Sequence, residues 1–105
     1  MRALIQQARD QRARVVIPAG VLAQVWRDGS RQVRLAALIN SRGVDVAPLT
    51  ERVAKAAGQL CGLRGTADII DASVVLAARE ATAIVVTSDP DDIRRLDPTL
   101  AIVRA

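Results

Sequence analysis

Apolar and polar positions follow two spacings along the chain, which predict short strands alternating with helices. Compact apolar runs predict strands over 14–17 and 44–47. Apolar residues at helical spacing predict helices over 3–12, 19–28 and about 31–40. The first half of the chain therefore reads as helix, strand, two helices and strand.

The second half continues this alternation. We expect a helix between Thr50 and Gly62, a helix over 66–79, a strand over 83–87, a short helical turn opening at 88–90, and a last strand over 100–103. The first of these helices has an inner stripe made of Val53, Ala57, Leu60 and Cys61.

Polar and glycine residues predict where the helices begin and end. Ser30, Thr50 and Thr66 are the expected caps, because a side-chain oxygen at that position accepts a hydrogen bond from the first turn. Gly43 and Gly62 are the expected stops.

Strands that alternate with helices predict an α/β fold with a mostly parallel sheet flanked by helices. The length of 105 residues fits one domain, 1–105. In parallel sheets, ligands bind outside the carboxyl ends of the strands. Asp89 follows the strand 83–87 almost directly, so we expect it at that edge.

The most informative residue is Asp71, which lies inside the apolar segment 66–79. A helix apolar nearly all round is a buried helix, and a carboxylate there is costly unless it is paired, hydrogen-bonded or bound to a metal. Three more carboxylates, Asp89, Asp91 and Asp92, follow the next strand. Two acidic clusters at the edge of an α/β core suggest a divalent-metal site.

The amino-acid composition limits which metal ligands and catalytic groups such a site can contain. The chain has no His and one Cys, Cys61, which excludes His-based catalysis, His or Cys-rich metal sites and an intrachain disulfide. Oxygen ligands favour Mg²⁺ or Mn²⁺. No run spans a membrane and no signal-peptide pattern opens the chain, so we expect a cytoplasmic protein. The only aromatic residue, Trp26, is expected in the core or an interface.

Charge is distributed unevenly. Residues 1–45 hold eight Arg and three Asp, whereas residues 65–100 hold three Arg and seven acids. The arginines most suited to RNA phosphates are Arg12, Arg14, Arg27, Arg31 and Arg34. They suit an acidic partner equally well, and ordinary solvated side chains are the simpler alternative.

Three segments together resemble the PIN domain, and more narrowly the VapC toxins of bacterial toxin–antitoxin pairs. They are Asp71-Ala-Ser followed by Val-Val-Leu-Ala-Ala, the run 86–92 (Val-Thr-Ser-Asp-Pro-Asp-Asp), and the run 17–27. The resemblance covers the chain from about residue 3 to its end. It implies a three-layer α/β sandwich that cleaves RNA with Mg²⁺ or Mn²⁺.

The resemblance also implies site residues and partners. Asp71 matches the third acid of the family's cluster and Asp89 the fourth, with Asp68 and Asp92 as auxiliary metal ligands and Thr87 and Ser88 in support. A VapB-like antitoxin that covers the site and a homodimer are the implied protein partners, and RNA is the implied substrate.

The chain departs from the family pattern at two positions. The family's first, central strand carries its first catalytic Asp, and this chain begins at about the helix that follows that strand. We therefore expect a sheet without its central strand, unless the start is misplaced or another strand, such as one swapped from a second copy, fills the gap. Gln24 stands where the family has its second acid.

Each acidic residue also has a structural explanation. Asp71 fits a buried carboxylate bonded to Ser73, Thr87 or a backbone N–H. Asp68 suits a helix start, and Asp89 and Asp92 suit a capped helix with Pro at its first position.

Two functions of different classes follow. The first is a VapC-like ribonuclease, and the second is an inactive PIN remnant that binds antitoxin or RNA without cleaving it. A phospho-acceptor domain is discounted, because it needs a Lys near the final strand and the only Lys, Lys55, lies in a middle helix.

Overall fold

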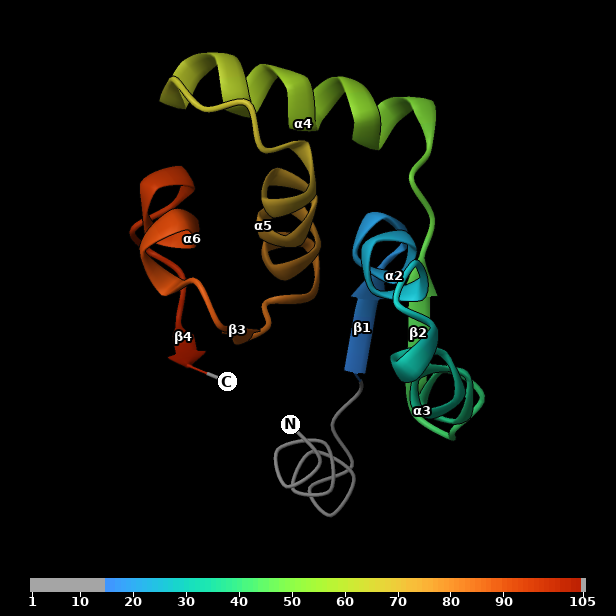
Figure 1. The fold of residues 1–105 in the computed structure, drawn as a ribbon. Helices are drawn as coiled ribbons and strands as arrows, with labels where there is room; N and C mark the ends of the chain where they lie inside the picture. The colour runs from blue at the N-terminus through green and yellow to red at the C-terminus, as the bar shows by residue number, and fades with distance from the viewer. Residues whose placement is uncertain (1–14, 105) are drawn as a thin grey trace. The chain divides into compact units, whose positions relative to one another are not determined.

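The computed structural model describes residues 15–104, which have α/β secondary structure with short parallel strands (Figure 1). The chain divides into two compact units, Met1–Pro48 and Leu49–Ala105, which are described separately below. The predicted helix 3–12, Arg12 and Arg14 lie outside the described residues. The prediction of one domain over 1–105 stays a prediction.

The first unit pairs two strands and carries two helices between them. Its elements are β1 (Val15–Pro18), α2 (Ala19–Trp26), α3 (Gly29–Ile39) and β2 (Val44–Ala47). β1 and β2 are parallel, with Val15 opposite Val44 and Ile17 opposite Val46. Among residues 15–48, Val44 is the only buried apolar residue.

The start of α3 differs from the prediction. Asp28, not Ser30, is the cap: its Oδ1 accepts from the Ser30 backbone N–H at 3.1 Å and from the Ser30 hydroxyl at 2.7 Å. These bonds stabilise the carboxylate and lower the pKa of Asp28. The helix ends at Ile39, and Gly43, with φ of 81°, serves the turn into β2.

The second unit has a core of its own. Its elements are α4 (Glu51–Arg64), α5 (Ile69–Ala81), β3 (Val85–Thr87), α6 (Pro90–Leu96) and β4 (Ile102–Arg104). β3 and β4 are parallel, with Val85 opposite Ile102 and Thr87 opposite Arg104. The buried apolar cluster consists of Ala57, Leu60, Cys61, Ala72, Val75, Ala78, Val85, Ile93 and Leu96.

The predicted start of α4 is confirmed and its predicted stop is wrong. The Thr50 hydroxyl accepts from the Val53 backbone N–H at 3.2 Å. Three members of the predicted inner stripe are buried, and Val53 is half-buried. Gly62 lies within the helix, which ends instead at Gly65, where φ is 67° and glycine tolerates the left-handed conformation.

The helix predicted over 66–79 is present as α5, but its cap, its burial and its end differ from the prediction. Asp68 caps the helix in place of Thr66, because its Oδ1 accepts from the Asp71 backbone N–H at 2.9 Å. Burial is one-sided, on Ala72, Ser73, Val75 and Ala78, while Ile69 is 42% exposed. The helix ends at Thr82 in a left-handed conformation, so β3 begins at residue 85 and not at 83.

A partly buried ion pair joins the ends of α5 and α6. The Arg79 Nε donates to Asp97 Oδ2 at 2.7 Å, and the Thr99 backbone N–H and hydroxyl donate to Asp97 Oδ1 at 2.9 and 2.6 Å. Asp97 is 5% exposed. The hydrogen bonds from Thr99 and Arg79 lower the pKa of Asp97 to about 2.

Candidate acidic site

The candidate site lies in the second unit, where β3 passes into α6 and α5 begins. Since β3 and β4 are parallel, their carboxyl ends meet at one edge, which is where ligands bind in such sheets. Thr87 ends β3, and its hydroxyl accepts from the Asp89 backbone N–H at 3.0 Å. This bond holds the turn that carries Asp89 at the predicted edge.

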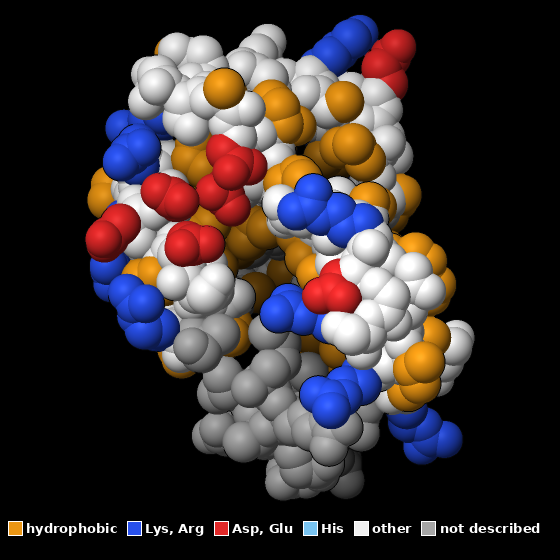
Figure 2. Space-filling view, in the orientation of Figure 1, with side chains coloured by type: hydrophobic (Ala, Val, Ile, Leu, Met, Phe, Trp, Pro, Cys, Tyr) orange, Lys and Arg blue, Asp and Glu red, His pale blue; other side chains and the backbone are white. Residues whose placement is uncertain are grey.

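Asp71 is the group whose chemistry is most perturbed there. It is half-buried in the first turn of α5. Burial, together with the negative charges of Asp68, Asp92 and Asp89, raises the pKa of Asp71 to about 6. The four carboxylates therefore share one electrostatic environment, and Figure 2 shows acidic side chains gathered on one face of this unit.

The other three carboxylates are exposed and differ in what holds them. One oxygen of Asp68 is occupied as the cap of α5. Asp89 Oδ2 accepts from the Ser88 hydroxyl at 3.5 Å, and Asp92 lies in the first turn of α6. The structure assigns Asp68 a definite capping role, and the grouping of these acids as metal ligands stays a prediction.

The carboxylates do not form a closed metal cage. Among residues 15–104, no three Asp, Glu or Cys side chains come close enough to hold one ion together, although their charges act on Asp71 at longer range. Mg²⁺ does not require such a cage, because it commonly binds one or two carboxylates and completes its shell with water and substrate phosphates. The described carboxylates therefore fit only a divalent ion that takes one or two of them as ligands and fills its remaining positions with water and substrate phosphates.

A basic residue that the sequence did not single out lies at the same edge. Arg104 ends β4, opposite Thr87, and its Nη1 donates to the Ser88 carbonyl oxygen at 3.3 Å. Its position depends on the pairing of β3 with β4, so no local pattern in the sequence marks it.

The remaining predicted residues lie in the first unit. Gln24, Arg27, Arg31 and Arg34 are all exposed, on α2, just after it, or on α3. Arg31 Nε pairs with Asp28 Oδ2 at 3.3 Å, which is a surface contact. The structure describes this unit by itself, so Gln24 is not grouped with the carboxylates here.

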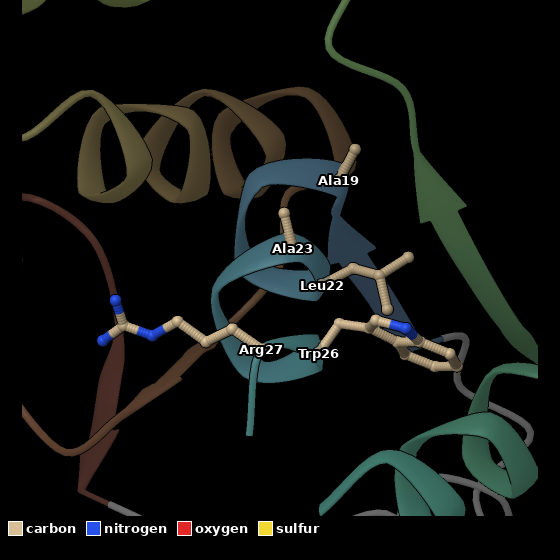
Figure 3. A pocket seen from close by; sticks show the side chains of 5 residues that line it. All are labelled: Ala19, Leu22, Ala23, Trp26 and Arg27. Carbon is tan, nitrogen blue, oxygen red and sulfur yellow. The ribbon is translucent and has the colours of Figure 1, made fainter. Parts of the chain in front are cut away.

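The side chains of α2 border an open, mostly apolar depression of about 530 Å³. Its lining is Ala19, Leu22, Ala23, Trp26 and Arg27, with Leu22 and Trp26 on one side of the helix and Arg27 directed away from them (Figure 3). Trp26, expected in the core or an interface, is 41% exposed, and α2 has no buried residue.

Comparison with protein-family models gives no match, and comparison with curated proteins gives none either. No helix within residues 15–104 has both the length and the apolar character needed to cross a membrane.

Proposed function

We propose that the chain is a PIN-type, VapC-like endoribonuclease that hydrolyses RNA phosphodiester bonds with Mg²⁺ or Mn²⁺. The observation that carries the proposal is the pKa of Asp71, raised to about 6 by burial and by three neighbouring carboxylates at the carboxyl end of β3. Mutual repulsion of this kind is what a bound divalent cation relieves. Perturbed carboxylates in such a place are typical of functional sites.

Each side chain has a separate task in this proposal. Asp71 and Asp89 hold the ion, Asp92 adds negative charge, and Asp68 orders the first turn of α5 through its cap. Thr87 fixes the turn that carries Asp89. When bound, the ion supplies activation of a water molecule and stabilisation of charge on the phosphate.

The fold and partners belong to the same proposal. We propose a PIN-like three-layer sandwich, and the parallel strand pairing within each unit, with helices between the paired strands in chain order, supports this. The proposed partners are RNA, a VapB-like antitoxin and a second copy of the chain, and the proposed location is the cytoplasm.

A second candidate is a PIN remnant that binds without cleaving. Two observations favour it: Gln24 is neutral where the resemblance calls for an acid, and no three described carboxylates come together for one ion. Fewer charged ligands weaken Mg²⁺ binding.

The test is Mn²⁺-dependent cleavage of a mixed pool of structured RNA. Three proteins are compared: the chain itself, Gln24→Glu, and Asp71→Asn in the Gln24→Glu background. We expect cleavage that needs both metal and Asp71, with a gain in Gln24→Glu. The matched control is Asp91→Asn, because Asp91 lies in the same turn as Asp92 but is 90% exposed and pairs with Arg94.

The outcomes separate the two candidates. Cleavage lost on chelation and in the Asp71→Asn variant supports the nuclease. Absence of cleavage by folded wild type and folded Gln24→Glu contradicts it and leaves the binding remnant.

A further inference from the structure

Arg104 is held beside the acidic site by the backbone of the loop that carries Asp89. Its guanidinium bonds to the Ser88 carbonyl oxygen at 3.3 Å, one residue before Asp89. The parallel register also sets Arg104 opposite Thr87, the last residue of β3. Two independent contacts, one from the strand pairing and one from the side chain, therefore hold it at this edge.

No carboxylate of the described residues forms an ion pair with Arg104. Arg79 pairs with Asp97 and Arg94 pairs with Asp91, whereas Arg104 makes no ion pair with the residues that the structure describes. Burial and neighbouring carboxylates raise the pKa of Asp71, and no guanidinium of residues 15–104 offsets them. Arg104 is exposed, so its remaining N–H groups are open to solvent.

An acidic site meets RNA at an electrostatic disadvantage, because the phosphate backbone is itself negative. A guanidinium at the rim offsets this repulsion, and its fork of N–H donors matches phosphate oxygens. The carbonyl contact with Ser88 directs the group without neutralising it.

We propose that Arg104 is a positioning residue that binds a backbone phosphate of single-stranded RNA next to the acidic site. This inference rests on the proposed function and adds a contact from the last strand to it. The arginines expected from the sequence to bind RNA all lie in the first unit or outside the described residues.

The test is the salt dependence of RNA binding, measured by fluorescence anisotropy with a labelled single-stranded RNA oligonucleotide in chelator. Each phosphate contact to a single strand contributes about 0.7 to the slope of log K against log salt concentration. We expect Arg104→Gln to lower the slope by about 0.7 and Arg104→Lys to preserve it, because Lys keeps the charge.

The matched control is Arg52→Gln, which replaces an exposed arginine at the beginning of α4 in the same unit. Equal slopes for wild type, Arg104→Gln and Arg52→Gln overturn the inference, as does a wild type that binds no RNA. Cleavage by wild type, measured separately with Mn²⁺, decides the proposed function, so either can fail while the other stands. Thermal melts of all variants show that each is folded.

Discussion

The ionisation of Asp71 costs the folded protein stability. Its pKa is raised to about 6, so the folded state holds the Asp71 proton more tightly than the unfolded chain does. Ionisation therefore costs stability progressively as pH rises from the unfolded value near 3.8 through about 6.

We expect Asp71→Asn to raise the melting temperature near neutral pH in chelator, because Asn removes the ionisation cost. The gain shrinks as pH falls from about 6 to about 4 and is absent at lower pH, where wild-type Asp71 is protonated in both states. Scanning fluorimetry across this range measures it. Asp91→Asn, at an exposed position in the same unit, is the control and gains no stability. A destabilised Asp71→Asn protein at neutral pH would contradict the argument.

Asp68 has two candidate roles, as the cap of α5 and as a metal ligand, and substitutions can separate them. As the cap of α5 it is replaceable by Ser, whose hydroxyl accepts the same bond from the Asp71 backbone N–H. We expect Asp68→Ala to lower stability by about 1 kcal/mol and Asp68→Ser to change it little. If cleavage is found, both variants retain it. Equal loss of Mn²⁺-dependent cleavage in both, with Asp68→Ser as stable as wild type, would show that Asp68 is a ligand.

At the scale of elements, the Arg79–Asp97 pair links the last turn of α5 to the end of α6. These two helices, β3 and the loop between β3 and α6 carry the candidate site residues Asp71, Thr87, Asp89 and Asp92, so this ion pair links two of the elements that carry them. The Asp97 carboxylate is buried, and removing its partner leaves an uncompensated charge.

We expect Arg79→Ala to lower the free energy of unfolding by about 2 kcal/mol, less than for fully buried pairs, because the Arg79 side chain is 43% exposed. Urea unfolding measures this. The control is Arg94→Ala, which breaks an exposed pair with Asp91 and costs less than about 0.5 kcal/mol. Similar losses of unfolding free energy in the two variants would show that the Arg79–Asp97 pair stabilises the protein no more than an exposed pair does.

The Arg79–Asp97 pair loses its contribution to stability as pH falls, whereas Asp71 costs stability as pH rises. Because the pKa of Asp97 is about 2 in the folded protein and 3.8 in the unfolded chain, its contribution to stability is complete above pH 3.8 and is lost as pH falls through about 2. Asp97→Asn removes this acid-side loss.

At the scale of the whole molecule, buried apolar side chains are distributed unequally. Within the described residues the second unit buries nine, from α4, α5, β3 and α6, whereas the first buries Val44. Local stability follows the density of buried apolar contacts. The two units therefore differ in resistance to opening.

We expect backbone amides of α4 and α5 to exchange hydrogen most slowly and those of α2 and α3 most quickly. Hydrogen exchange followed by mass spectrometry on the full chain measures this. Equal protection of α2 and α5 would show that the first unit is stabilised by contacts beyond its own core.

Local chemistry was sufficient to predict much of this molecule. The order of helices and strands from 15 to 104, the Thr50 cap and the inner stripe of α4 all follow from side-chain period and turn residues. The grouping of Asp71 with the acids after β3 followed from an unusual carboxylate in an apolar segment and from the parallel connection. Short-range patterns specify such features because neighbouring residues alone decide them.

Contacts between distant residues decided the rest. Arg79 finds Asp97 18 positions away, and Arg104 reaches Ser88 16 positions away, through packing and strand pairing that no local spacing encodes. The one-sided burial of α5 and the grouping of strands into two pairs are likewise tertiary outcomes. The sequence determined which elements form and which acids are unusual, because period and polarity act locally. Only the tertiary structure decided which charges meet, because pairing depends on how those elements pack.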